Sequence, residues 1–168
     1  MSGVKSTPTW VNDSLIIYTK RSKPNENGSK FFDLYQYDFV NEEETRLTKE
    51  GRVFSPFYDK EENIIFALNT FDGTTNIVAY DIIDSSLTQL TNYNDGIQMF
   101  SVSKYKDDFL VDAVINHERD FYIINSNDNE NKFYKQEPWD LRDPVINDDI
   151  LIYSDDRTGI YNLYFKDL

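Results

Sequence analysis

Residues 142–167 read RDPVINDDILIYSDDRTGIYNLYFKD. The short apolar run 150–153 has the β-branched and aromatic content of a buried strand. The run 163–167 alternates apolar and polar residues, as a half-buried strand does, and closes on Asp. Between the two runs, Thr158-Gly159 supplies a glycine for the positive φ that tight hairpins need. This stretch predicts an antiparallel hairpin.

The same pattern occurs three more times along the chain. Alternating runs end at Asp38, Asp81 and Asn125, so that with Asp167 the closing residues lie 43, 44 and 42 residues apart. A fixed period of 20–50 residues is the mark of a repeat architecture. The further apolar runs are 15–18, 64–66 and 109–111, and the alternating runs that follow them are 34–38, 77–81 and 121–125.

The hairpin turns repeat as well. Asp72-Gly73 lies two periods before Thr158-Gly159, which makes it the turn of the second repeat. Asn27-Gly28 belongs to a hairpin about six residues longer than its siblings, and we interpret that hairpin as carrying a loop insertion that includes Pro24.

Prolines mark the start of three repeats. Within the apolar runs, Ile16, Ile65 and Leu151 follow Pro8, Pro56 and Pro144 by eight, nine and seven residues, and Ser101 takes the proline's place in the third repeat. A proline is tolerated at the start of a strand or where the ladder needs no donor. An innermost strand is therefore expected at each of these places.

An outermost strand is also expected in each repeat. We assign it to residues 46–48 and 89–91, two Leu-Thr segments that lie 43 residues apart, and to Phe133-Tyr134 in the third repeat. Four short antiparallel strands every forty-odd residues correspond to one β-propeller blade.

The predicted fold is all-β: a β-propeller of about four blades of four-stranded antiparallel sheet, incomplete and open. The whole chain, residues 1–168, is expected to be a single propeller domain or a fragment of one, with repeats at about 7–48, 49–91, 92–134 and 135–168. A closed four-bladed ring, with the residues before Pro8 completing the last blade, is the alternative.

The repeat resembles the WD-like repeat of TolB-like bacterial propellers. That pattern runs Leu-Thr, Pro-x-aromatic-Ser-Pro-Asp-Gly, an apolar strand, then Ser-Asp-Arg-x-Gly-x-x-x-Ile-Tyr and a closing Asp. Its parts are matched at Pro8-Thr9-Trp10, Leu47-Thr48, residues 56–59 and 72–77, and most fully at residues 153–164. The Ser-Pro-Asp-Gly turn is eroded in all four repeats, at residues 11–13, 59–61, 103–105 and 146–148. The resemblance implies more blades, usually six, than this chain supplies.

Composition limits the partners. Seventeen basic against thirty acidic residues give a formal charge of −13, which would repel a phosphate backbone. Nucleic acid is therefore not an expected partner. Because the acids are spread along the chain, we interpret them as a solubilising surface.

The sequence shows no feature of a membrane or disulfide-bonded protein. It has no Cys, so disulfides and thiolate metal sites are excluded, and cysteine usage gives no compartment. The first ten residues lack the apolar core of a signal peptide, and no stretch approaches the roughly twenty apolar residues that span a bilayer.

Catalytic motifs are missing too. His117 is the only histidine, and it stands where Gly73 and Gly159 stand in their repeats, which predicts a turn residue. We interpret Asp155-Asp156-Arg157 as a structural Asp–Arg pairing, although glycosidases also use paired carboxylates. The stretch 125–130 alternates oxygen ligands as a calcium loop does but lacks the turning Gly. No catalytic, cofactor-binding or metal site is predicted.

Function follows from the resemblance. It implies a non-catalytic scaffold, not an enzyme and without a cofactor, that binds a protein partner in the bacterial periplasm. Loops on a rigid scaffold are where binding residues usually reside. The alternative is the substrate-gating propeller of a prolyl oligopeptidase-like or tricorn-like peptidase, and a propeller glycosidase is a third option. Aromatic side chains that could anchor a partner or pack the blades are Tyr35, Tyr37, Tyr80, Trp139 and Tyr161.

Overall fold

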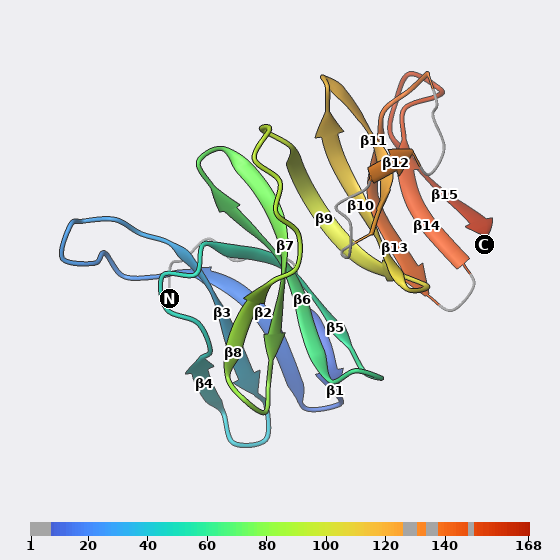
Figure 1. Ribbon diagram of the computed structural model, residues 1–168. Coiled ribbons are helices and arrows are strands. Elements are labelled where there is room, and N and C mark those ends of the chain that lie inside the picture. Colours follow the sequence, from blue (N-terminus) through green and yellow to red (C-terminus); the bar gives the residue numbers. More distant parts are fainter. Residues whose placement is uncertain (1–7, 126–130, 134–137, 148–149) are drawn as a thin grey trace. The chain divides into compact units, whose positions relative to one another are not determined.

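The computed structural model describes residues 8–125, 131–133, 138–147 and 150–168. All regular secondary structure among the described residues is β-strand (Figure 1). No helix long and apolar enough to cross a membrane occurs in the described part of the chain. The chain divides into two compact units, Met1–Phe71 with Asn76–Gln89, and Asp72–Thr75 with Leu90–Leu168.

The first unit holds two four-stranded sheets, each a meander in which every strand pairs antiparallel with the next in the chain. The apolar runs predicted at 15–18 and 64–66 lie in β2 and β6, and the alternating runs at 34–38 and 77–81 lie in β3 and β7. The first sheet comprises β1 (Thr9–Asn12), β2 (Leu15–Arg21), β3 (Phe32–Asp38) and β4 (Glu43–Arg46), and the second β5 (Val53–Asp59), β6 (Ile64–Phe71), β7 (Thr74–Asp81) and β8 (Ser86–Gln89).

The second unit repeats this arrangement and holds the third and fourth sheets of the chain. The third sheet has four described strands, and the fourth has three. The third comprises β9 (Gln98–Tyr105), β10 (Asp108–Ile115), β11 (Glu118–Ile124) and β12 (Asn131–Phe133), and the fourth β13 (Leu141–Asn147), β14 (Ile150–Asp155) and β15 (Asn162–Asp167). The remaining predicted runs lie in β10, β11, β14 and β15, with Asn125 directly after β11.

In each unit one sheet packs its face on the next. In the first unit, Ile17 and Leu34 of the first sheet are fully buried against a cluster on the second sheet that includes Val53 of β5. In the second unit, Leu110 and Phe121 of the third sheet are buried with Leu141 and Leu151 of the fourth. A blade cannot bury both faces alone, so these contacts between sheets form the core of each unit.

The closing aspartates hold the turns between outer strands. Oδ1 of Asp38 accepts hydrogen bonds from the backbone N–H groups of Val40 and Asn41. Asp81 Oδ1 does the same for Ile83 and Asp84. Because Asp side chains readily bond backbone groups two and three residues on, the repeat ends on Asp for a local structural reason.

Two hairpin turns have the same backbone conformation. Asp72 and Gly73 both have positive φ, at 48° and 78°, and so do Asn116 and His117, at 52° and 71°. Each pair joins two strands directly, as in a two-residue type I′ hairpin. The prediction that His117 is a turn residue is therefore confirmed.

Pro56 and Pro144 sit at irregularities in the innermost strands, whereas Pro8 directly precedes β1. Pairing shifts register between Phe54 and Phe57, around Pro56, and between Arg142 and Val145, around Pro144. A bulged residue needs no ladder partner, which is why proline is accepted there.

The predicted outermost strands were placed too far along the chain. β4 and β8 end at Arg46 and Gln89, and the Leu-Thr pairs follow them. The cause is visible in the first sheet, where the Thr48 hydroxyl accepts the hydrogen bond of Leu34 N–H and so replaces a strand carbonyl. In the third repeat Phe133 lies in β12, and Tyr134 is outside the described residues.

Candidate functional site

The most exposed apolar side chains of the first unit stand at its hairpin tips. Val40 in the β3–β4 turn is 76% exposed, and Ile83 in the β7–β8 turn is 80% exposed. They occupy the same place in consecutive repeats, two residues after Asp38 and Asp81. The backbone N–H of Val40 donates a 2.8 Å hydrogen bond to Asp38 Oδ1, and that of Ile83 donates a 2.7 Å bond to Asp81 Oδ1. Both turns lie at the lower end of the first unit in Figure 1.

An aromatic group lies beside one of these tips. Phe39, which is 49% exposed, stacks on Trp10 with ring centroids 5.7 Å apart and meets Tyr37 edge-on at 5.0 Å. We refer to Phe39, Val40 and Ile83 together as the tip surface. Aromatic pairs of this kind hold a contact surface rigid at little entropic cost.

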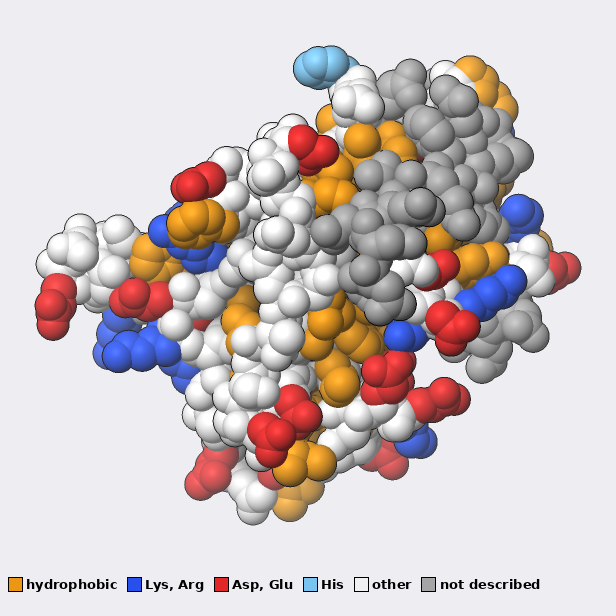
Figure 2. Space-filling view, in the orientation of Figure 1, with side chains coloured by type: hydrophobic (Ala, Val, Ile, Leu, Met, Phe, Trp, Pro, Cys, Tyr) orange, Lys and Arg blue, Asp and Glu red, His pale blue; other side chains and the backbone are white. Residues whose placement is uncertain are grey.

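Carboxylates flank the residues of the tip surface along the chain. The pKa of Asp38 is held below its usual range, first by the hydrogen bond from the Asn41 side chain and then by the N–H groups of Val40 and Asn41. Glu42 follows in the same turn, Glu43 begins β4, and Asp84 follows Ile83. Figure 2 shows hydrophobic side chains lying between acidic ones at this end of the first unit. The surface therefore combines an apolar centre with a negative rim.

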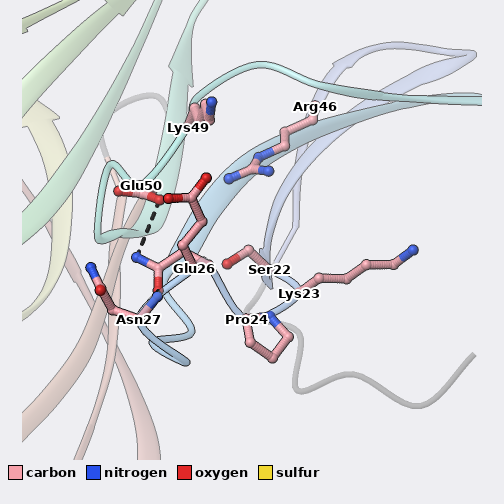
Figure 3. A pocket seen from close by; sticks show the side chains of 9 residues that line it. Ser22, Lys23, Pro24, Glu26, Asn27, Arg46, Lys49 and Glu50 are labelled. Atoms are coloured by element: carbon pink, nitrogen blue, oxygen red, sulfur yellow. Dashed lines mark hydrogen bonds between the residues drawn. The ribbon is translucent and has the colours of Figure 1, made fainter.

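A second feature of the first unit is a hollow of about 440 Å³ beside the long β2–β3 connection (Figure 3). Its wall carries three cationic and two anionic side chains, and an amide of Asn25 bonds Glu50 at 3.3 Å. The hydroxyl of Ser22, its buried lining residue, accepts a hydrogen bond from Phe31 N–H. The lining residues are Ser22, Lys23, Pro24, Asn25, Glu26, Asn27, Arg46, Lys49 and Glu50.

The insertion predicted at this connection is present as residues 22–31 between β2 and β3. Asn25 organises it, because its side-chain oxygen accepts the N–H groups of Asn27 and Ser29. Arg46, which reaches into the hollow, donates to Asp33 and to the carbonyl of Thr48. These hydrogen bonds connect parts of the first sheet to each other. We therefore assign the hollow no ligand.

Buried carboxylates in both units serve the fold in the same way. Asp33 accepts hydrogen bonds from Arg46 Nη2 at 2.7 Å, Thr48 Oγ1 at 3.0 Å and Gly51 N–H at 2.8 Å. Arg119 binds Asp112 through two bonds of 3.0 and 2.9 Å. An acid that is buried and held by arginine is poorly placed to exchange protons with a substrate.

Two buried acids of the second unit, Asp112 and Asp155, have pKa values shifted in opposite directions. Burial raises the pKa of Asp112, and the hydrogen bonds from Arg119 only partly oppose that effect. Burial also acts to raise the pKa of Asp155, but the side-chain and backbone hydrogen bonds from Arg157 outweigh it and lower the pKa. The structural pairing predicted for Asp155 and Arg157 is thus seen as direct hydrogen bonds, Nε lying 2.9 Å from Oδ1 and 2.8 Å from Oδ2.

The aromatic candidates divide between core and surface. Tyr35 and Tyr80 are buried between strands. Tyr37 is half-buried against Phe39, and Arg157 lies 5.1 Å over the ring of half-buried Trp139. Tyr161 is exposed, with Arg142 over its ring at 4.4 Å. Most of these aromatic side chains therefore pack within the fold.

Sequence reasoning missed Val40 and Ile83, although a signal was present. The segments Asp38-Phe39-Val40 and Asp81-Ile82-Ile83 repeat at 43 residues. Among the described residues, no group of three or more His, Asp or Glu side chains is arranged to hold a metal ion. Most of the stretch 125–130, whose oxygen ligands alternate as in a calcium loop, lies outside the described part of the chain, at residues 126–130.

No protein-family model matches this sequence, and no curated protein is significantly similar to it. Solved structures are similar in fold. TolB from Acinetobacter baumannii superposes with a TM-score of 0.74 at 12% identity, covering 98% of this chain and 41% of that one. A putative TolB from Agrobacterium tumefaciens gives 0.68 at 10% identity, over 99% of this chain and 78% of that one.

A protease domain is similar as well. The β-propeller domain of the Trilobed protease from Pyrococcus furiosus gives a TM-score of 0.63 at 11% identity, over 99% of this chain and 55% of that one. These likenesses extend over nearly the whole chain and confirm the predicted β-propeller fold, whose antiparallel sheets are its blades. The chain spans less than half the length of the Acinetobacter TolB chain.

Proposed function

We propose that this β-propeller segment is a non-catalytic scaffold whose tip surface binds a partner protein. The apolar centre and negative rim of that surface fit a partner with an apolar recess bordered by Lys and Arg. The resemblance of the repeat to TolB-like propellers supports a place in the bacterial cell envelope, and the periplasm is part of the proposal.

One observation carries the proposal: Val40 and Ile83 are held outward at the same place in two consecutive repeats. A single exposed apolar residue is ordinary on a protein surface. Here the Asp38 and Asp81 turns present both side chains at one end of the unit, and Phe39 adds aromatic area beside one of them. Aromatic residues at the centre of a patch with a polar rim are typical of protein interfaces, and Phe39 and Trp10 are of this kind.

The position of the histidine and the pairing of two buried carboxylates support the non-catalytic part of the proposal. His117 stands on a hairpin turn, and Asp112 and Asp155 are engaged by Arg119 and Arg157. A propeller that gates a peptidase would need its hydrolase elsewhere in the protein. A hydrolase sequence next to this segment in the gene would therefore favour that alternative.

The binding test compares a double variant of the tip surface with a single variant on another surface. Val40→Ser with Ile83→Ser removes the apolar centre, and Ile160→Ser, at a 67% exposed apolar residue on the β14–β15 loop, is the control. Envelope extract is passed over each immobilised protein, and a retained protein is purified and titrated by calorimetry. We expect the double variant to bind at least about tenfold more weakly, from a loss of about 1.4 kcal/mol or more.

Salt provides an independent check. If the acidic rim meets a basic partner, affinity falls as ionic strength rises.

The variant comparison can contradict the proposal. Equal binding by wild type and the Val40/Ile83 double variant, or a greater loss of binding with Ile160→Ser, would place the binding surface elsewhere.

A further inference from the structure

Arg52, directly before β5, packs on two phenylalanine rings. Its guanidinium carbon lies 4.7 Å from the ring centroid of Phe31, which precedes β3, and 5.4 Å from that of Phe71, the last residue of β6. A cation is attracted to an aromatic face at such distances. Two elements of the first unit therefore hold the guanidinium in place.

This arginine lacks the anionic partner that most arginines of the chain have. Four of the six arginines bind a carboxylate in the described structure: Arg46 with Asp33, Arg119 with Asp112, Arg142 with Asp140 and Arg157 with Asp155. Among the described residues, the Arg52 guanidinium has neither an ion pair nor a hydrogen bond. Arg21 shares this property, but it lies over a single ring, that of Phe32, at 5.6 Å. The donors of Arg52 are therefore free for a ligand.

The backbone that carries Arg52 is fixed in a costly conformation. Arg52 has a φ of 52° and Glu50 one of 58°, values that are unfavourable for residues with a Cβ. Between them, Gly51 N–H donates to the buried carboxylate of Asp33, and the carbonyl of Arg52 accepts a hydrogen bond from Thr70 N–H at 3.4 Å. The direction in which Arg52 leaves the sheet is thus set by the fold and not by its own preference.

The repeat itself does not require an arginine here. Strand register aligns β5 with β9 and β13, so that Gln98 and Asp140 hold the place of Arg52 in the third and fourth sheets. An amide, a carboxylate and a guanidinium share no packing role. The arginine is therefore a feature of this one repeat.

The chemistry of the site suits a carboxylate. A guanidinium that lies over rings still presents N–H donors along its edge, and these match the two oxygens of a carboxylate. Phe71 is 61% exposed, so it offers apolar surface beside those donors. The formal charge of −13 opposes a ligand with several negative charges, and Glu50 and Asp72 stand close to Arg52 and Phe71 in the sequence. The expected ligand carries one carboxylate next to an apolar group.

We propose that Arg52, Phe31 and Phe71 form a binding site for an Asp or Glu side chain that stands beside an apolar residue in a partner peptide. This site is separate from the tip surface and does not depend on it. Phe31 precedes β3 and Val40 follows it, while Phe71 precedes β7 and Ile83 follows it. The two surfaces therefore lie at opposite ends of the same strands (Figure 1).

The test uses two peptides that differ by one functional group. The probe is acetyl-Ala-Leu-Glu-Leu-Ala-amide, in which Glu carries the only charge, and its comparison has Gln in place of Glu. Each is titrated into the full chain labelled with ¹⁵N, and the Nε–H signal of Arg52 is followed by NMR. We expect the Glu peptide to shift this signal saturably and the Gln peptide to bind at least about tenfold more weakly.

Variants assign the binding to named side chains, with the backbone N–H of Gly51 as the reporter. Arg52→Gln should weaken the Glu peptide at least about tenfold, and Arg52→Lys, which keeps the charge without the planar fork, should weaken it less. Phe71→Ala removes the exposed ring and should also weaken binding. Lys60→Gln is the control, because it removes one positive charge from an exposed residue in the β5–β6 turn, at the other end of β5.

Four results would overturn the proposal. Equal affinity for the Glu and Gln peptides, or unchanged affinity in Arg52→Gln, would show that no carboxylate is recognised here. Equal losses in Lys60→Gln and Arg52→Gln would indicate attraction to the overall charge instead of a site. Inorganic phosphate that shifts the Arg52 signal at lower concentration than the Glu peptide would assign the site to phosphate.

Discussion

The backbone N–H of Gly51 donates a 2.8 Å hydrogen bond to Oδ1 of Asp33, eighteen residues earlier in the chain. Asp33 is fully buried, and it also accepts hydrogen bonds from Arg46 and Thr48. The bond joins β3 of the first sheet to the segment that leads into β5. Asp33 therefore ties together the segments that carry the chain from the first sheet to the second.

Replacing Asp33 should be among the most damaging changes in the first unit. Asp33→Ala leaves Gly51 N–H and the Thr48 hydroxyl without this acceptor and Arg46 without its ion pair, at a cost of about 3 kcal/mol. Asp33→Asn keeps an acceptor oxygen and should cost about half as much, since Asn76 holds this place in the second repeat. Urea unfolding of both variants measures the difference. Equal costs would show that the charge on Asp33 is what matters.

Gly51 should not tolerate a side chain. A Cβ at this position would lie 2.9 Å from Cγ2 of Val53 and 3.2 Å from the Thr48 hydroxyl. Val53 is β-branched and fully buried, so it has little room to move, and Gly51→Ala should cost about 1 to 2 kcal/mol. Chemical denaturation in wild-type and Val53→Ala backgrounds provides the check. The cost should shrink in the second background, and an unchanged cost would mean that the clash lies elsewhere.

His117→Gly should stabilise the protein. His117 has φ of 71°, a conformation that is costly for a residue with a Cβ, and Gly73 holds the matching place in the second repeat. The expected gain is about 0.5 to 1 kcal/mol, while Gly73→Ala should lose a similar amount. Thermal unfolding of both variants tests the pair. A loss of stability in His117→Gly would mean that the imidazole makes a contact important to the fold.

The Asp155–Arg157 pair should contribute to resistance against acid. The pKa of folded Asp155 lies below its usual value, so its ionised form stabilises the fold above about pH 4. That contribution is lost as pH falls through the lowered folded pKa. Asp155→Asn should therefore lower the unfolding midpoint most at pH 7, and the gap to wild type should narrow toward pH 3.

A matched control for this prediction is Asp140→Asn. Asp140 also pairs with an arginine, Arg142, but both side chains are more than a third exposed. Exposed pairs contribute little, so this variant should follow the wild-type curve across the pH range. A gap for Asp155→Asn that stays constant with pH would show that ionisation of Asp155 does not carry the effect.

The strands themselves were predictable because local rules govern them. Period-two alternation marked β3, β7 and β15, and the glycine at position 73 marked a tight turn. His117 could be identified as a turn residue because the repeat aligned it with Gly73. The boundaries of β4 and β8 could not be predicted, since a side-chain hydroxyl, that of Thr48, takes over a bond that a strand carbonyl would make.

By itself, the sequence determined the repeat, the all-β class and the turn positions, since these depend on side-chain pattern and on backbone conformation within a few residues. Tertiary structure alone decided which repeated residue is covered. Leu34 and Leu163 hold the same place in their repeats, yet only Leu34 is buried. Burial depends on the neighbouring sheet that packs over a face, and a residue's own local sequence carries no record of that neighbour.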